Sequence, residues 1–153
     1  MSRMIFVNLP VENLERSKAF YEALGFRNEP KFSNDAAAMM VLSETISVML
    51  LTKPFYSSFT DRPIADTHKT SAVLLCISCE DRAEVDRIVE AAAAAGGKMD
   101  MSPKSEAGDG PMYGRDFEDP DGHQWEPMWM DPAFAEKGAH PVEDCAQSTA
   151  VSA

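Results

Sequence analysis

The first part of the chain contains both of the hydrophobic periods that mark regular structure. In Met4–Val11 the side chains alternate between two faces, which predicts a strand. In Leu14–Leu24 apolar residues recur at helical spacing, which predicts a helix that Asn13 caps and Gly25 ends. Three more strands are expected before residue 53: Phe26–Phe32, Ala37–Leu42 and Thr45–Thr52.

The second part of the chain repeats this order. Ser71–Cys79 predicts a strand, Asp81 a helix N-cap, and Gly96 with Gly97 the end of that helix. Asp81 stands where Asn13 does, 68 residues later. The helix carries one apolar stripe: Val85, Ile88, Val89 and Ala92. The strands that follow it are Lys98–Ser102, Met112–Glu118 and His123–Met130. The sequence therefore predicts an α+β fold of two βαβββ modules.

We expect one domain over residues 1–130, followed by a C-terminal tail. The parts of the domain are module one (3–52), a connecting loop (53–69) and module two (70–130). The tail, residues 131–153, begins with a short helix capped by Asp131 and is expected to be partly disordered, beyond Gly138.

The connecting loop is longer than most loops and carries three aromatic residues, Phe55, Tyr56 and Phe59. Left exposed, these rings would promote aggregation, so we expect them to pack on another part of the protein. Two interpretations stay open. The rings pack on the outside of a sheet, or Phe55 and Phe59 belong to a lid that contacts a ligand.

Composition narrows the class of protein. The chain has 153 residues, of which 44% are hydrophobic and 25% charged, and a net charge of −11. This acidity argues against nucleic acid as a partner, and it reflects either solubility or a cleft that attracts a cationic small molecule. With no apolar run long enough for a membrane and no signal peptide, we expect a cytoplasmic protein. Cys76 and Cys79 lie in an alternating strand pattern, which fits ordinary thiols better than a redox pair.

Three segments together resemble the vicinal oxygen chelate superfamily, which contains glyoxalase, bleomycin-resistance and extradiol-dioxygenase proteins. They are VNLPVENLERSKAFYEALGF (Val7–Phe26), LLCISCEDRAEVDRIVEAAAAAGG (Leu74–Gly97) and FEDPDGHQWEP (Phe117–Pro127). The resemblance covers Met4 to Met130. It implies two βαβββ modules that form a curled mixed sheet around a cavity, which a homodimer usually completes.

The metal enzymes of this superfamily place their ligands at four cavity-facing positions. The resemblance puts these positions at Phe6, Met49 (or Leu50, if the register shifts by one), Leu74 and Glu126, of which only Glu126 can coordinate a metal. We therefore predict no divalent metal and no other cofactor. The histidines at 68, 123 and 140 are interpreted as exposed side chains, and the acidic turn 119–122 as ordinary turn chemistry.

The last strand sets a charged residue between two tryptophans. Alternation directs Trp125 and Trp129 towards a helix and Glu126 into the cavity. If the turn 119–122 closes a tight hairpin, Arg115 pairs with Glu126 across the strands. This pair either belongs to the site or only stabilises the sheet. The predicted ligand-binding residues are Phe6, Asn8, Met49, Leu74, Tyr113, Arg115, Met128, Phe55 and Phe59.

Two functions are compatible with these residues. The first is a metal-free protein of the superfamily that binds a small aromatic or amphipathic molecule, as a homodimer, in an apolar cavity. The alternative is a glyoxalase-like lyase or isomerase, or a dioxygenase-related enzyme, that uses Glu126 as a catalytic group. A general base works best with a raised pKa. Because Arg115 beside Glu126 would lower that pKa, the enzyme ranks second.

Overall fold

The computed structural model describes residues 2–102 and 110–138. Its first sheet has the strand order β1-β4-β3-β2, in which β1 and β4 are parallel and the other pairs antiparallel. The strands are β1 (Ile5–Val11), β2 (Arg27–Glu29), β3 (Ala37–Val41) and β4 (Ile46–Thr52).

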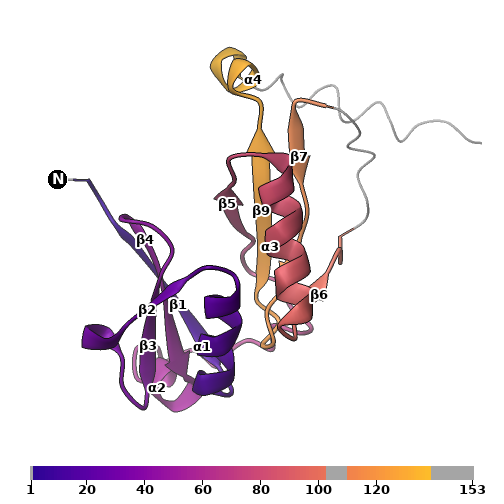
Figure 1. The fold of residues 1–153 in the computed structure, drawn as a ribbon. Coiled ribbons are helices and arrows are strands. Elements are labelled where there is room, and N and C mark those ends of the chain that lie inside the picture. The colour runs from indigo at the N-terminus through magenta and orange to yellow at the C-terminus, as the bar shows by residue number, and fades with distance from the viewer. Residues whose placement is uncertain (1, 103–109, 139–153) are drawn as a thin grey trace, which may run out of the picture.

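The second sheet repeats this arrangement. Its order is β5-β9-β8-β6, with β5 and β9 parallel and β7 paired to β9 as well. The strands are β5 (Leu75–Ser78), β6 (Lys98–Met99), β7 (Met112–Gly114), β8 (Phe117–Glu118) and β9 (Gln124–Met130). Figure 1 shows the two sheets as separate modules of one chain. The predicted α+β fold with two βαβββ modules is confirmed.

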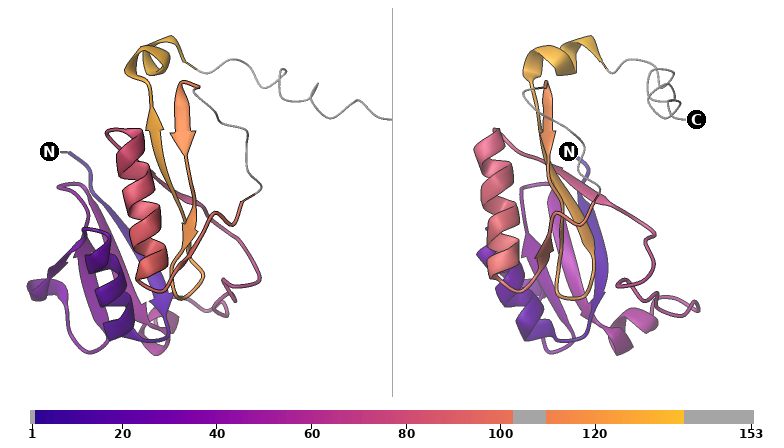
Figure 2. Two further views of the ribbon diagram at one scale, coloured as in Figure 1. Left: turned by 45° about the vertical axis from the view of Figure 1, so that its right-hand side comes forward. Right: turned by 90° about the vertical axis from the view of Figure 1, so that its right-hand side faces the viewer.

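Each module has one long helix, and both begin where the sequence predicts. Helix α1 (Leu14–Ala23) starts after Asn13, whose side chain accepts a hydrogen bond from the backbone N–H of Arg16 at 3.0 Å. Helix α3 (Arg82–Ala94) starts after Asp81, which accepts from the N–H of Glu84 at 2.7 Å. The right-hand view of Figure 2 shows α1 and α3 on one side of the sheets, with the connecting segment on the other.

The helix-covered sides of both sheets meet in one core. Phe20 and Tyr21 of α1 pack against Phe117 and Trp125 of the second sheet, and the Tyr21 and Trp125 ring centroids lie 5.9 Å apart. The Phe117 and Trp125 rings stack at 6.2 Å. Because helix α1 contributes to the packing of the other module, the two modules share their buried surface rather than folding around separate cores.

Several element boundaries differ from the prediction. The strand expected to reach Phe32 ends at Glu29, because Pro30 has no N–H for the ladder and instead starts a 3₁₀ turn, η1 (Pro30–Phe32). The strand expected over Met112–Glu118 is broken into β7 and β8. The connecting segment opens with a helix, α2 (Lys53–Ser57).

The C-terminal helix is present as α4 (Pro132–Lys137), and Asp131 caps it by accepting a bond from Ala133 N at 2.8 Å. The disorder predicted beyond Gly138 concerns residues outside the described part. Within the described ranges, none of the helices has the length and apolar character needed to span a membrane.

Candidate functional site

Each sheet has an open face, which we define as the face turned away from its helix. In the first sheet Leu9 and Val48 belong to the core, so alternation turns Asn8 and Met49 to the open face, where they are paired neighbours. The second sheet repeats the pattern with Cys76 and Glu126, which are paired across β5 and β9.

Apolar side chains stand at equivalent points of both open faces. Phe6 of β1 is 47% exposed, and Leu74, directly before β5, is 52% exposed. Met128 lies on the open face of β9, two residues beyond Glu126. The open faces therefore hold most of the apolar residues predicted to bind a ligand, with Asn8 and Glu126 as polar groups among them.

Strand alternation explains why Glu126 stands between two tryptophans. Trp125 is 2% exposed and lies in the core, whereas Glu126 is only half-buried and lies on the open face. Its neighbour there is the Cys76 thiol. Burial raises the pKa of Cys76, and the negative charge of Glu126 raises it further.

The prediction that Tyr113 and Arg115 point into the cavity is wrong. The Tyr113 hydroxyl donates to Asp86 Oδ1 of α3 at 2.7 Å, and Arg115 Nη1 donates to the same oxygen at 2.8 Å. Arg115 also bonds Asp100 through Nε at 3.0 Å and Nη2 at 2.8 Å. Both side chains thus lie on the helix side of the sheet. The hydrogen bonds from Tyr113 and Arg115 lower the pKa of Asp86.

The cause is a difference of one residue in strand register. The expected hairpin paired Phe117 with Gln124, but Phe117 pairs with Trp125, and the N–H of Arg115 donates to the carbonyl of Pro127 at 3.3 Å. A shift of one residue moves every side chain of a strand to the opposite face. Arg115 therefore lies beside the helix and forms no pair with Glu126.

Two aromatic residues of the connecting segment, Phe55 and Phe59, pack on each other. Phe55 and Phe59 make an edge-on contact with ring centroids 5.0 Å apart, and Phe59 is 68% exposed. Helix α2, which carries Phe55, lies beside β1 and β4. The role of these rings in a lid stays a prediction.

The family's metal-ligand positions hold unsuitable side chains. Phe6 and Leu74 carry no donor atom, Met49 offers only a thioether, and Glu126 is the single carboxylate. In the described part of the chain, no three His, Cys, Asp or Glu side chains gather closely enough to hold a metal ion. The residues present do not fit the metal chemistry of the superfamily's enzymes.

The acidic turn before β9 is buried, and the prediction that His123, directly after this turn, is exposed is wrong. Asp119, Asp121 and His123 are 3%, 8% and 7% exposed. Asp119 accepts hydrogen bonds from the Tyr21 hydroxyl at 2.7 Å and from the backbone N–H groups of Asp121 and His123 at 2.9 Å. Burial raises the pKa of Asp119, whereas the nearby His123 and the bond from Tyr21 lower it.

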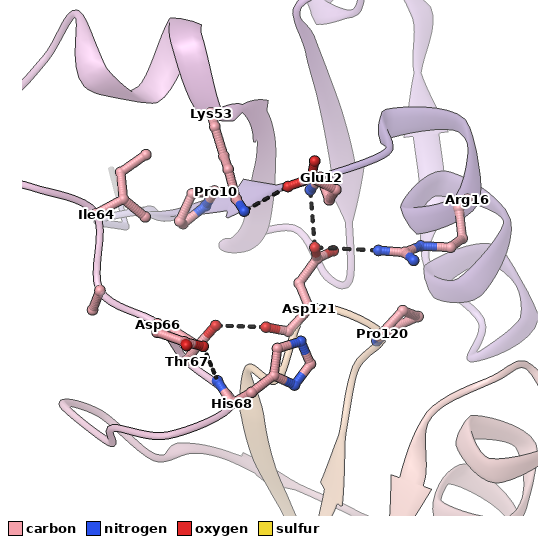
Figure 3. Close-up of a pocket in the computed structure, with 11 residues that line it drawn as sticks. Pro10, Glu12, Arg16, Lys53, Ile64, Asp66, Thr67, His68, Pro120 and Asp121 are labelled. Atoms are coloured by element: carbon pink, nitrogen blue, oxygen red, sulfur yellow. Dashed lines mark hydrogen bonds and ion pairs between the residues drawn. The ribbon is translucent and has the colours of Figure 1, made fainter.

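Asp121 joins this turn to the start of α1 in the other module. Its carboxylate accepts from Glu12 N at 2.9 Å and from Arg16 Nη2 at 3.2 Å (Figure 3). It also accepts from the Ser17 hydroxyl at 3.2 Å. His123 Nε2 bonds the carbonyl of Pro10 at 2.8 Å. We call this set of contacts the inter-module clasp. Its partners are about a hundred residues apart in sequence, so the local turn pattern gives no sign of them.

A cavity of about 600 Å³ lies next to the inter-module clasp (Figure 3). Its charged groups are paired with one another or with neighbours: Lys53 with Glu12 at 2.5 Å, Arg16 with Asp121, and Asp66 with Lys69 at 3.2 Å. These pairs lower the pKa values of Glu12 and Asp66. The paired charges favour a structural role for the cavity lining over ligand recognition. The lining residues are Pro10, Glu12, Arg16, Lys53, Ile64, Ala65, Asp66, Thr67, His68, Pro120 and Asp121.

Paired βαβββ modules with open, partly apolar sheet faces define the structural class of the protein. A family model described as the Glyoxalase/Bleomycin resistance protein/Dioxygenase superfamily matches residues 3–126, and the chain belongs to that superfamily. No curated protein sequence matches the chain.

Solved structures share this fold. A hypothetical protein, SA1046, from S. aureus is 25% identical, with a TM-score of 0.68 over 84% of this chain and 94% of its own. A glyoxalase-related enzyme from Fulvimarina pelagi is 21% identical, with a TM-score of 0.66 over 84% and 88%. A bleomycin resistance determinant encoded on the transposon Tn5 is 17% identical, with a TM-score of 0.52 over 85% and 99%.

Proposed function

We propose that the protein is a metal-free member of the superfamily that binds a small aromatic or amphipathic molecule against the open faces of its sheets. The observation that carries the proposal is the exposure of Phe6 and Leu74 at equivalent points of the two modules. Apolar walls with a few polar groups, here Asn8 and Glu126, are typical of small-molecule pockets. The net charge of −11 favours a ligand with a positive charge.

In this proposal a second copy of the chain covers the open faces and encloses the ligand between the two copies. The open faces expose apolar side chains, and pairing two copies would remove them from water. Size-exclusion chromatography with light scattering should give the mass of two chains at micromolar concentration. A mass near one chain would exclude the dimer while leaving ligand binding to be tested separately.

The proposal includes no divalent metal, because Phe6 and Leu74 cannot coordinate one, and it invokes no other cofactor. Elemental analysis of the purified, tag-free protein should find far less than one equivalent of zinc, nickel, manganese or iron per chain. A value near one equivalent, with a matching rise in melting temperature, would contradict this part of the proposal.

A thermal-shift screen of drugs, phenols and thiol conjugates tests ligand binding, since a ligand of the folded state raises the melting temperature. Phe6→Ala and Leu74→Ala should each weaken binding of a hit about tenfold, because each removes apolar contact area from the site. Phe32→Ala is the matched control, since Phe32 is 64% exposed but lies beyond the outer strand β2. Equal losses in all three variants would contradict the assigned site.

A ligand found by the screen also tests whether the connecting segment acts as a lid. If the connecting segment closes over the ligand, Phe55→Ala or Phe59→Ala should weaken binding at least tenfold, and hydrogen exchange in this segment should slow on binding. Unchanged affinity in both variants would make the segment a plain connector.

One observation favours the enzyme as a second candidate. Arg115 is held by Asp86 and Asp100 on the helix side, so it is no partner of Glu126. The reason for ranking a catalytic Glu126 second is therefore removed. Turnover of the methylglyoxal–glutathione hemithioacetal that disappears in Glu126→Gln would establish a glyoxalase-like lyase. Absence of turnover with this substrate would leave the binding protein as the better proposal.

A further inference from the structure

One serine of the first sheet is buried in an unusual state. Ser47 of β4 is 1% exposed, and its hydroxyl oxygen is buried without a hydrogen-bond partner among the described residues. Buried hydroxyl groups nearly always have a partner, because an unpaired one destabilises the folded protein. A buried polar atom of this kind calls for a specific explanation.

The position of Ser47 supplies one. The next residue, Val48, belongs to the core, so the Ser47 side chain points to the open face of the first sheet. On that face its paired neighbours are Phe6 on β1 and Val41 on β3. Phe6 is 47% exposed and is therefore a side chain that can turn aside. The hydroxyl thus lies just below the apolar surface proposed to bind a ligand.

We infer that Ser47 is a further polar contact of this site, besides Asn8 and Glu126, and that its ligand is an aromatic molecule with an uncharged hydrogen-bonding oxygen, of the phenol class. The inference rests on the proposed ligand-binding function and names its ligand class. The oxygen enters between Phe6 and Val41 and pairs with the hydroxyl, which can donate and accept. The apolar neighbours select an uncharged group, because a buried ion would find neither an opposite charge nor enough hydrogen bonds there.

Two small probes of nearly equal shape, 4-methylphenol and toluene, test the inference by NMR titration. Placing a hydroxyl in an apolar site without a partner is unfavourable, so toluene would bind more tightly if Ser47 took no part. With Ser47 as partner, the phenol should bind about threefold to tenfold more tightly than toluene in the wild type. In Ser47→Ala that order should reverse.

A second readout needs no ligand. Removing an unpaired buried hydroxyl should raise the melting temperature of free Ser47→Ala by about 2–4 °C. The matched control is Ser78→Ala, an exposed serine of strand β5, which should stay within about 1 °C of the wild type. A serine that only supports the fold would instead give a lower melting temperature on removal.

These experiments distinguish a failure of the role of Ser47 from a failure of the proposed ligand-binding function. Three results would overturn the role of Ser47 and leave the proposed function standing. They are a wild type that binds toluene at least as tightly as 4-methylphenol, the same order of binding in Ser47→Ala as in the wild type, and a lower melting temperature of the variant. If neither probe bound the wild type at millimolar concentration, the result would count against the proposed function, and the inference would fall with it.

Discussion

Asp121→Ala is expected to be among the most destabilising single changes outside the apolar core. The carboxylate is 8% exposed and accepts bonds from the Ser17 hydroxyl, which is fully buried, and from the backbone of Glu12. Each of these two hydrogen bonds goes to a charged group, and its loss leaves the donor unpaired. The loss of each bond therefore costs about 1.5 kcal/mol. The ion pair with Arg16 adds at most about 0.5 kcal/mol, because the Arg16 side chain is 46% exposed.

These contributions give a loss of about 3 kcal/mol in the free energy of unfolding, which corresponds to about 6–12 °C in melting temperature for a chain of this length. Urea titration, followed by the fluorescence of the buried Trp125, measures it. Asp121→Asn keeps one acceptor oxygen and should lose about half as much. Asp61→Ala removes the same charge from an exposed position and is the matched control. A difference between Asp121→Ala and Asp61→Ala below about 1 kcal/mol would refute the energetic role of the inter-module clasp.

Three further changes test other parts of the structure. Gly97→Ala should lower the free energy of unfolding by about 2 kcal/mol or more, since a β-carbon there would press on a backbone carbonyl of β8, whereas Gly110→Ala meets open space and should stay within about 0.5 kcal/mol. In a protein whose other cysteines are replaced by serine, Glu126→Gln should lower the pKa of Cys76. Iodoacetamide should then alkylate this thiol at least about twofold faster at pH 8. An unchanged rate would contradict the contact between Cys76 and Glu126. Arg115→Gln should lower the free energy of unfolding by about 1 kcal/mol, because the bonds of Arg115 to α3 disappear. Its affinity for any ligand of the open faces should stay unchanged, and weaker binding would show that Arg115 contributes to the site.

Much of the fold follows from local sequence signals. The caps at Asn13 and Asp81 and the apolar stripe of the second helix all depend on residues within one or two turns of each other, and the structure confirms them. The faces of β1 and β9 follow equally well, because strand alternation has a fixed period of two. Phe6 and Glu126 could therefore be placed without any long-range information.

The errors concern contacts that join distant segments. The register of β8 against β9 depends on how the turn closes, and the turn is shaped by Tyr21 and Ser17, about a hundred residues earlier. A local pattern with two aspartates and a glycine resembles any exposed turn. For the same reason the burial of His123, which bonds the first module, could not be recognised.

The hydrogen bonds that Asp119 accepts within the buried turn also explain why Glu126 reaches the open face. Asp119 holds the backbone of the turn through the N–H groups of Asp121 and His123, and so fixes the residue at which β9 begins. A slip of one residue would exchange the faces of Trp125 and Glu126, placing a carboxylate in the core and a large apolar ring in water. The buried polar turn and the open-face residues are thus coupled through strand register. Changes at Asp119 are expected to alter the open face of β9 although Asp119 does not belong to it.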